Sequence, residues 1–136
     1  KENGWEFASH TWGHISPKDR GLGVTQTDTQ RWKENVATIV GDTDVIIFAF
    51  GADIGDWEPY TSDNELFAYY KEQGFNIYCN VDASSTYWVQ FGSNYMRQAR
   101  RNLDGYRMYY NPELISDLFD VDAVWDSSRP TPVPEM

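Results

Sequence analysis

Both histidines of the 136-residue chain lie in one short segment, as His10 and His14. Imidazoles four residues apart point the same way from a helix, and they can also converge from a turn that follows a strand. Imidazole nitrogen is a good ligand for Zn²⁺ and related transition metals, but a catalytic zinc also needs a third protein ligand and an open position for water. The spacing alone fits a metal site, and it also fits two surface histidines that lie close by chance.

The residues before the histidines favour the metal site. In the stretch 4–9, Trp5 and Phe7 alternate with Glu6 and Ala8, which predicts a strand that leads directly into His10. In α/β folds, functional sites form at the carboxyl ends of strands. We therefore expect the pair to lie at such an edge.

Other side chains are weaker candidates. Asp53 and Asp56 follow an apolar run and could face the metal, although such residues more often cap loops and turns. Trp57 and Trp88 could stack on sugar rings, and burial in the core is an equal alternative. Cys79 lies in an apolar run, so we expect an inert buried thiol, and a single cysteine excludes an intrachain disulfide.

The segment His10-Thr11-Trp12-Gly13-His14 resembles the H-[ST]-x-x-H motif of the polysaccharide deacetylase family, also called NodB-homology proteins or carbohydrate esterase family 4. The resemblance implies an incomplete (β/α) barrel and a metal-dependent hydrolase that removes acetyl groups from N-acetylated, or O-acetylated, polysaccharide. It also implies that His10 and His14 bind a divalent transition metal, with zinc the first expectation. It further implies an extracellular or cell-envelope protein.

The family's other signatures are incomplete here. The T-F-D-D-G segment that supplies the family's base and third ligand is not present, and we expect the native chain to extend upstream of Lys1 to include it. Where the family has an Arg-containing stretch, this chain keeps only Phe50-Gly51. A D-x-x-x-W type segment is matched loosely by Asp82 and Trp88, which the resemblance makes substrate-binding candidates together with Trp57.

The family's terminal L-x-H signature has no counterpart, because the chain has no third histidine. Arg107 and Tyr109 occupy roughly that region as substitute candidates. With base and acid unidentified, we expect the isolated chain to be nearly inactive. Three interpretations stay open: a deacetylase-like hydrolase, a catalytically degenerate relative that acts as a carbohydrate-binding or structural module, and an unrelated α/β domain with a chance HxxxH.

The elements that must position these residues alternate between strand and helix, which predicts an α/β fold with a parallel sheet, either open or as part of an incomplete (β/α) barrel. We expect one domain over 1–128 and an extended Pro-rich tail over 129–136. Strands are predicted at 4–9, 44–50, 75–81, 106–110 and 121–125, with 86–91 a short strand or an aromatic turn. Helices are predicted at 27–40, 62–74, 93–105 and 112–119, and a loop at 16–27. The basic residues at 97–101 are predicted to form a solvated helix face.

The formal net charge of −10 argues against two classes of partner. Such a chain repels the phosphates of nucleic acid and an anionic membrane surface. No run of eighteen apolar residues is present, so no transmembrane helix is predicted. The family resemblance instead implies an acetylated polysaccharide or oligosaccharide as the partner.

Overall fold

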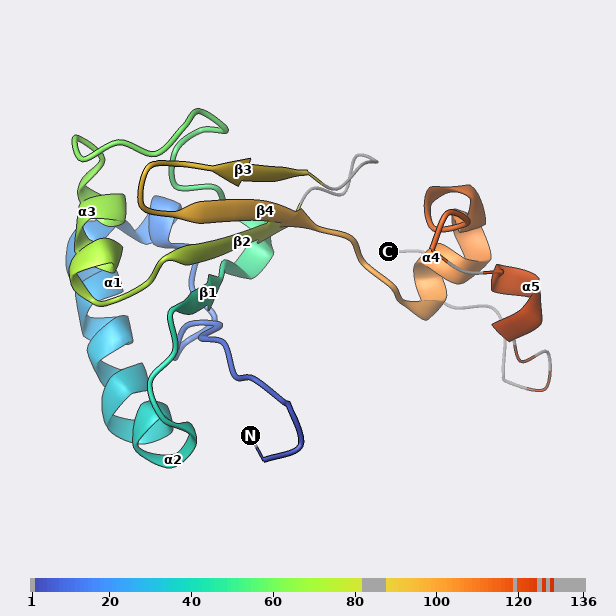
Figure 1. Ribbon diagram of the computed structural model, residues 1–136, viewed down its shortest axis with the longest axis horizontal. Coiled ribbons are helices and arrows are strands. Elements are labelled where there is room, and N and C mark those ends of the chain that lie inside the picture. The colour runs from blue at the N-terminus through green and yellow to red at the C-terminus, as the bar shows by residue number, and fades with distance from the viewer. Residues whose placement is uncertain (1, 82–87, 119, 125, 127, 129–136) are drawn as a thin grey trace.

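A computed structural model describes residues 2–81, 88–118, 120–124, 126 and 128, and shows a mixed α/β protein (Figure 1). The described part contains a four-stranded sheet in the order β1-β2-β4-β3. Its strands are β1 (Val45–Ile47), β2 (Ile77–Val81), β3 (Val89–Phe91) and β4 (Met96–Arg100). The strands β1, β2 and β4 are parallel and β3 is antiparallel to β4, so the predicted parallel sheet is confirmed for three strands.

The first predicted strand, at 4–9, is wrong except at its last residue. Ser9 forms an isolated parallel bridge with Ile46, and its backbone exchanges hydrogen bonds with Val45 and Ile47 at 2.9 and 2.7 Å. Trp5 is 76% exposed and Phe7 is 45% exposed. The alternating apolar side chains that predicted a half-buried strand are therefore not buried in the described structure.

A long helical segment precedes β1. It consists of α1 (Pro17–Trp32), the π-helical turn η1 (Lys33–Ala37) and α2 (Thr38–Val40). The Ser16 side chain caps α1, and Pro17 occupies its first turn. The predicted loop at 16–27 is therefore wrong, while the predicted helix at 27–40 is confirmed. Gly21 lies inside α1 with a φ of 74°, so the helical geometry is interrupted at this residue. Because glycine is typical of loops, the sequence around Gly21 predicted a loop.

The helix α3 (Glu65–Glu72) is capped by Asn64, whose side chain accepts a hydrogen bond from the Phe67 backbone N–H at 2.9 Å. Figure 1 shows α1 and α3 next to each other beside the sheet. Aromatic and aliphatic side chains from α3, the sheet and the connecting loops form one buried cluster: Ile46, Phe48, Ile54, Tyr60, Leu66, Phe67, Tyr70, Phe75, Tyr78 and Tyr95. Cys79 is buried as expected, and burial raises the pKa of its thiol.

The C-terminal part differs most from expectation. The predicted helix at 93–105 is strand β4 in its centre, and the predicted strand at 106–110 is helix α4 (Gly105–Tyr110). The Asp104 side chain caps α4 by accepting from the Arg107 backbone at 2.8 Å. The turn η3 (Pro112–Leu114) covers only the start of the predicted helix at 112–119, and α5 (Val121–Val124) replaces the predicted strand at 121–125. The tail at 129–136 lies outside the described residues.

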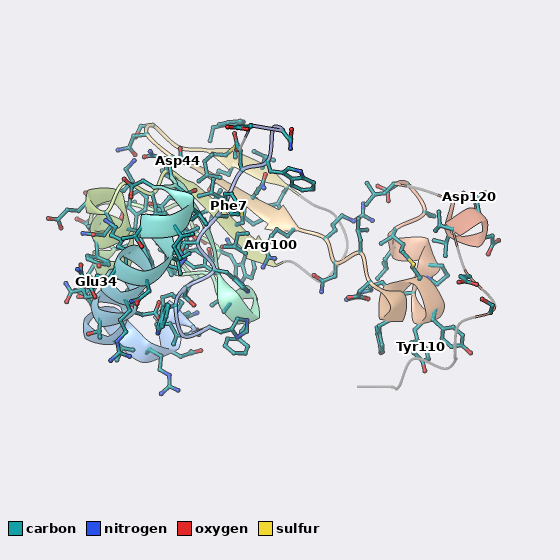
Figure 2. The ribbon with its side chains drawn as sticks, turned by 90° about the horizontal axis from the view of Figure 1, so that it is seen from below. Phe7, Glu34, Asp44, Arg100, Tyr110 and Asp120 are labelled. Carbon is teal, nitrogen blue, oxygen red and sulfur yellow. The ribbon has the colours of Figure 1, made fainter. Side chains whose placement is uncertain are left out.

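Both α4 and α5 lie beyond the end of β4, apart from the sheet (Figures 1 and 2). In Figure 2, Tyr110 and Asp120 are well separated from Arg100 at the end of β4. An ion pair of 2.7 Å between Arg101 and Asp117 joins the chain after β4 to the segment that follows η3. The described part has no helix long and apolar enough to cross a membrane.

Candidate functional site

The bridge between Ser9 and Ile46 places His10 at the carboxyl end of β1. The Nδ1 atom of His10 lies 2.8 Å from the carbonyl oxygen of Ile47. Because a carbonyl oxygen only accepts hydrogen bonds, this contact assigns the proton to Nδ1 and leaves a lone pair on Nε2. A backbone carbonyl that orients an imidazole in this way is the usual support of a metal-binding histidine.

The ring of His14 lies beside that of His10, with the ring centres 4.9 Å apart and the planes at 76°. Two imidazoles bound to one tetrahedral zinc at ordinary Zn–N distances have their centres about 5 Å apart. Both side chains are exposed, so a metal can reach them. The two predicted ligands therefore lie together, in an arrangement that fits a shared ion.

A buried carboxylate on α1 holds the turn between the histidines. Asp28 accepts hydrogen bonds from the backbone N–H groups of Trp12 and Gly13 at 2.8 and 2.7 Å. A Cβ on Gly13 would lie 3.1 Å from the Asp28 carboxylate, so glycine permits this close approach. Nothing in the HxxxH spacing indicated Asp28, because its role depends on how α1 packs against the segment 11–14.

Backbone strain concentrates near the histidines and in the segment after β1. The described non-glycine residues with positive φ are Thr11, His14, Phe50, Asp56 and Trp57, with φ between 50° and 71°. For a bulky residue such a conformation is costly, and it persists where the surrounding structure enforces it, often at functional sites. The 75% exposed Phe50 lies 4.7 Å from His14, measured between ring centres, so the two strained segments meet at the histidines.

For Asp53 and Asp56 the structure favours the alternative of loop and turn residues over contact with a metal. The exposed Asp56 pairs with Lys18. The buried Asp53 caps its own loop instead, accepting from the backbone N–H groups of Gly55 and Trp57. Among the described residues, no three His, Cys, Asp or Glu side chains form a group that could hold a metal ion. Asp82, a substrate-binding candidate, lies outside the described residues.

Asp53 is the centre of a buried polar network. Its carboxylate lies 3.3 Å from Nη1 of Arg97 and 2.8 Å from Nδ2 of Asn80, and it also accepts from the hydroxyl of Tyr60. Burial raises the pKa of Tyr60, and the hydrogen bond to Asp53 adds to this effect. The network connects the loop after β1 to the middle of the sheet.

Arg97 is the main polar residue that the sequence did not indicate. It was expected on a solvated helix face, but it lies on β4 and is 3% exposed. Its Nε donates to Gln90 at 2.6 Å and its Nη2 donates to the Trp57 carbonyl at 2.5 Å. Its guanidinium also lies 4.8 and 5.1 Å from the ring centres of Tyr60 and Trp88.

The structure brings together the two tryptophans that were candidates for sugar stacking. The ring centres of Trp57 and Trp88 are 6.3 Å apart, with the planes at 77°. Together with Gln90 and Arg97 they line a hollow of about 430 Å³. The core alternative is wrong for Trp57, which is 50% exposed.

The substitute candidates for the missing acid do not lie at the histidines. Arg107 and Tyr109 are on α4, which Figures 1 and 2 show apart from β1 and its carboxyl end. The described structure therefore removes both residues as partners of the histidine pair.

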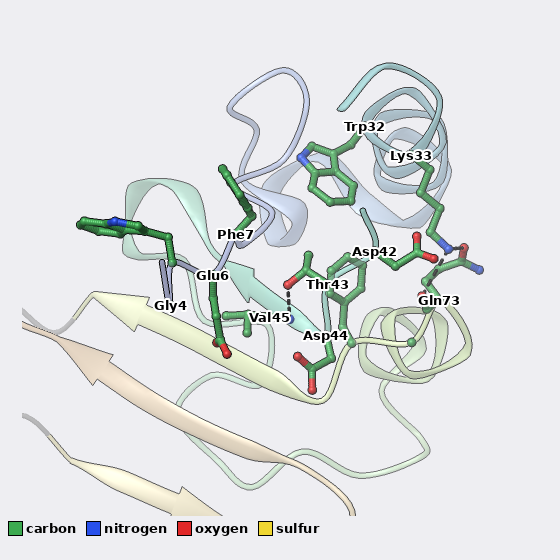
Figure 3. A pocket seen from close by; sticks show the side chains of 13 residues that line it. Gly4, Glu6, Phe7, Trp32, Lys33, Asp42, Thr43, Asp44, Val45 and Gln73 are labelled. Atoms are coloured by element: carbon green, nitrogen blue, oxygen red, sulfur yellow. Dashed lines mark hydrogen bonds between the residues drawn. The ribbon is translucent and has the colours of Figure 1, made fainter. Parts of the chain in front are cut away.

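A larger hollow of about 710 Å³ lies at the opposite, amino end of β1 (Figure 3). Its polar contacts include those of Lys33 to Gln73, at 2.8 Å between side chains, and of the Thr43 hydroxyl to the Val45 backbone at 3.2 Å. These bonds join the ends of neighbouring elements, and no histidine is among the described residues that line this hollow. The carboxyl end, with its histidines, is the better candidate site.

No protein-family model, curated protein or solved structure matches the chain. The assignment of function therefore rests on the residues and their geometry.

Proposed function

We propose that the chain is part of a metal-dependent hydrolase of the polysaccharide deacetylase type, in which His10 and His14 bind a divalent transition metal, with zinc the first choice. Its substrate is an acetylated polysaccharide or oligosaccharide. The four-stranded sheet is then a part of the family's incomplete (β/α) barrel. The observation that carries this proposal is the histidine pair at the carboxyl end of β1, with ring centres 4.9 Å apart.

The donor type suits a zinc-type ion, and the histidine pair would supply two of the three protein ligands that a catalytic zinc needs. The contact with the Ile47 carbonyl occupies Nδ1 of His10, so Nε2 is the nitrogen that would bind the metal. Asp28 fixes the turn that brings His14 beside it. A bound metal of this kind supplies a water of lowered pKa and polarises the acetyl carbonyl. The chain's own part is to hold two imidazoles in a convergent arrangement and to offer aromatic rings to the sugar.

Zinc titration by calorimetry tests the proposal without depending on activity. We expect one site of modest affinity in the 136-residue chain, because two neutral histidines alone hold a metal weakly. His10→Ala and His14→Ala should each abolish the heat of binding. Gln26→Ala, a change of an exposed polar side chain on α1, is the matched control and should bind as the unmodified protein does. Equal heats for all four proteins would contradict the metal site.

A second candidate function is a carbohydrate-binding module derived from the same family without its activity. The hollow between Trp57 and Trp88 favours it, because aromatic rings at a surface commonly bind the apolar faces of sugars. Acetate release from an N-acetylglucosamine oligomer by the protein in its native form separates the two functions. Binding without release supports the module, and release supports the hydrolase.

A further inference from the structure

The hollow beside β3 has the shape of an open aromatic corner. The ring planes of Trp57 and Trp88 stand at 77° to each other, and Gln90 and Arg97 are the other described residues that line the hollow. Its volume of about 430 Å³ lies within the ordinary range of small-ligand pockets. A flat ring that stacks on one indole would meet the other indole with its edge.

The lining disfavours an anionic ligand. The charge of Arg97 is compensated by Asp53, and both side chains are buried. Each guanidinium nitrogen already donates to a protein acceptor: Nε to Gln90, Nη1 to Asp53 and Nη2 to the Trp57 carbonyl. The formal net charge of −10 repels acidic ligands in addition. A neutral ligand suits this corner better than a uronate or a phosphate.

The same ion pair holds Trp57 in position. Trp57 has a φ of 71° and follows Asp56 with a φ of 54°, so two successive residues adopt a left-handed conformation. The Trp57 N–H donates to Asp53 and its carbonyl accepts from Arg97, both at 2.5 Å. The two members of the ion pair therefore hold the backbone N–H and the carbonyl of Trp57, and this fixes the orientation of its indole relative to the loop.

We propose that Trp57 and Trp88 form a subsite for a neutral sugar ring, and that Arg97, together with Asp53, is the positioning residue that holds Trp57 in this subsite. The choice of a sugar rests on the proposed function. Indole faces cover the C–H faces of pyranose rings. The side-chain amide nitrogen of Gln90 has no hydrogen-bond partner among residues 2–81 and 88–118, and it is available to a sugar hydroxyl or acetamido oxygen.

Ligand binding is tested in the presence of a chelator, so that its outcome is independent of zinc. Fluorine NMR of protein labelled with 5-fluorotryptophan reports each indole. Addition of triacetylchitotriose should shift the resonances of Trp57 and Trp88, and trigalacturonate should not. Trp57→Ala and Trp88→Ala should each weaken binding about tenfold, equivalent to the loss of one good stacking contact.

Trp5→Ala is the matched control, because Trp5 is exposed at the opposite end of β1 and should not affect binding. Equal affinity of the Trp57, Trp88 and Trp5 variants, equal binding of the acidic trisaccharide, or no binding of either sugar would overturn the subsite. Failure of zinc to bind would instead overturn the metal site and leave this subsite standing.

The positioning role is tested with Arg97→Lys, which keeps the charge but cannot donate to Asp53, Gln90 and Trp57 together. We expect a displaced Trp57 resonance without ligand, an unchanged resonance for the buried Trp32, and binding weakened about tenfold. In a Trp57→Ala background the same change should weaken binding no further. Additive losses would show that Arg97 acts without Trp57 and would overturn the positioning role. If Arg97→Lys does not fold, Asp53→Asn tests the same link by the same resonances.

Discussion

Two buried aspartates each hold a strained loop, and they do so in different ways. Asp28 accepts from the backbone N–H groups of Trp12 and Gly13, and within the described part of the chain it has no ion-pair partner. Asp53 accepts from two backbone N–H groups of its own loop and also pairs with Arg97. One loop is fixed by hydrogen bonds alone, and the other by hydrogen bonds and a buried charge pair.

The difference separates two requirements of a binding site. The loop held by Asp28 presents two exposed imidazoles that must remain free to bind a ligand. The loop held by Asp53 presents Trp57 and is tied to the core through Arg97, Asn80 and Tyr60. Disruption of the first loop should therefore affect ligand binding more than stability, and disruption of the second should affect both.

Asp53→Ala is expected to have the largest effect. It leaves the guanidinium of Arg97 buried without its counter-charge, and breaking a buried pair in this way costs about 3–5 kcal/mol. Urea denaturation followed by circular dichroism measures the change in the free energy of unfolding. Lys18→Ala is the control, because its pair with Asp56 is exposed and such pairs contribute about 0–1 kcal/mol. Similar losses for both variants would show that the Asp53 network is not a buried ion pair in solution.

Asp28→Asn is expected to cause the next largest change in the free energy of unfolding. The substitution replaces one carboxylate oxygen with an amide N–H₂ group that faces a backbone donor, so one charge-assisted hydrogen bond is lost, at a cost of about 1.5–3 kcal/mol. The zinc affinity should fall as well, because the turn between His10 and His14 loses its support. Denaturation and zinc titration measure the two effects. An Asp28→Asn protein that binds zinc as tightly as the unmodified chain would show that the turn holds itself.

High pH should lower the stability of the region around Asp53. Burial raises the pKa of Tyr60, which donates to Asp53, and of its neighbour Tyr78 above the ordinary value near 10. Because the unfolded chain loses these protons first, their contribution is present below about pH 10 and is lost as the pH rises above it. Denaturation at a series of alkaline pH values, with phenolate absorbance, measures this loss.

Tyr60→Phe sharpens the same test. At neutral pH it removes one hydrogen bond to the Asp53 carboxylate and should cost about 1.5–3 kcal/mol. It also removes one of the raised tyrosines, so the stability of the variant should fall less steeply above about pH 10. An identical alkaline slope in both proteins would mean that Tyr60 does not titrate with a raised pKa.

The sequence predicted the elements that local pattern determines. The apolar runs around β1 and β2 are confirmed as strands, because paired parallel strands are typically nearly continuous apolar stretches. The helix around α3 is confirmed near its predicted start, since a capping side chain and an apolar stripe are local signals. The parallel arrangement itself followed from alternation of these elements.

The C-terminal elements were not predictable from pattern. In β4 the buried positions alternate, and one of them is Arg97, which a hydrophobic pattern reads as exposed. Its burial depends on Asp53, which lies in a distant loop. The segment 106–110 is rich in aromatic residues and reads as a strand, yet Asp104 caps it as a helix in which Tyr106 and Tyr110 stack one turn apart.

In the candidate site, too, the sequence predicted what local spacing determines and missed what depends on distant partners. The pairing of His10 and His14 followed from their spacing and from the strand end before them, although only Ser9 of that strand forms a bridge. Asp28 and Arg97 were missed because their partners lie far away in the sequence. No local signal marked Arg97, because the residues of Met96–Arg100 do not alternate between apolar and polar types.

The antiparallel pairing of β3 and β4 has a consequence for the order of folding. The two strands are joined by the short turn 92–95, whereas β1 reaches β2 only after the whole segment 48–76. Closing a short loop costs less chain entropy, so the hairpin that carries Arg97 is expected to form before the loop that carries Asp53 reaches it. Arg97 then stays hydrated until the loop packs. Its ion pair with Asp53 is therefore expected to form after the transition state of folding. Loss of Asp53 should therefore accelerate unfolding and leave the rate of folding nearly unchanged.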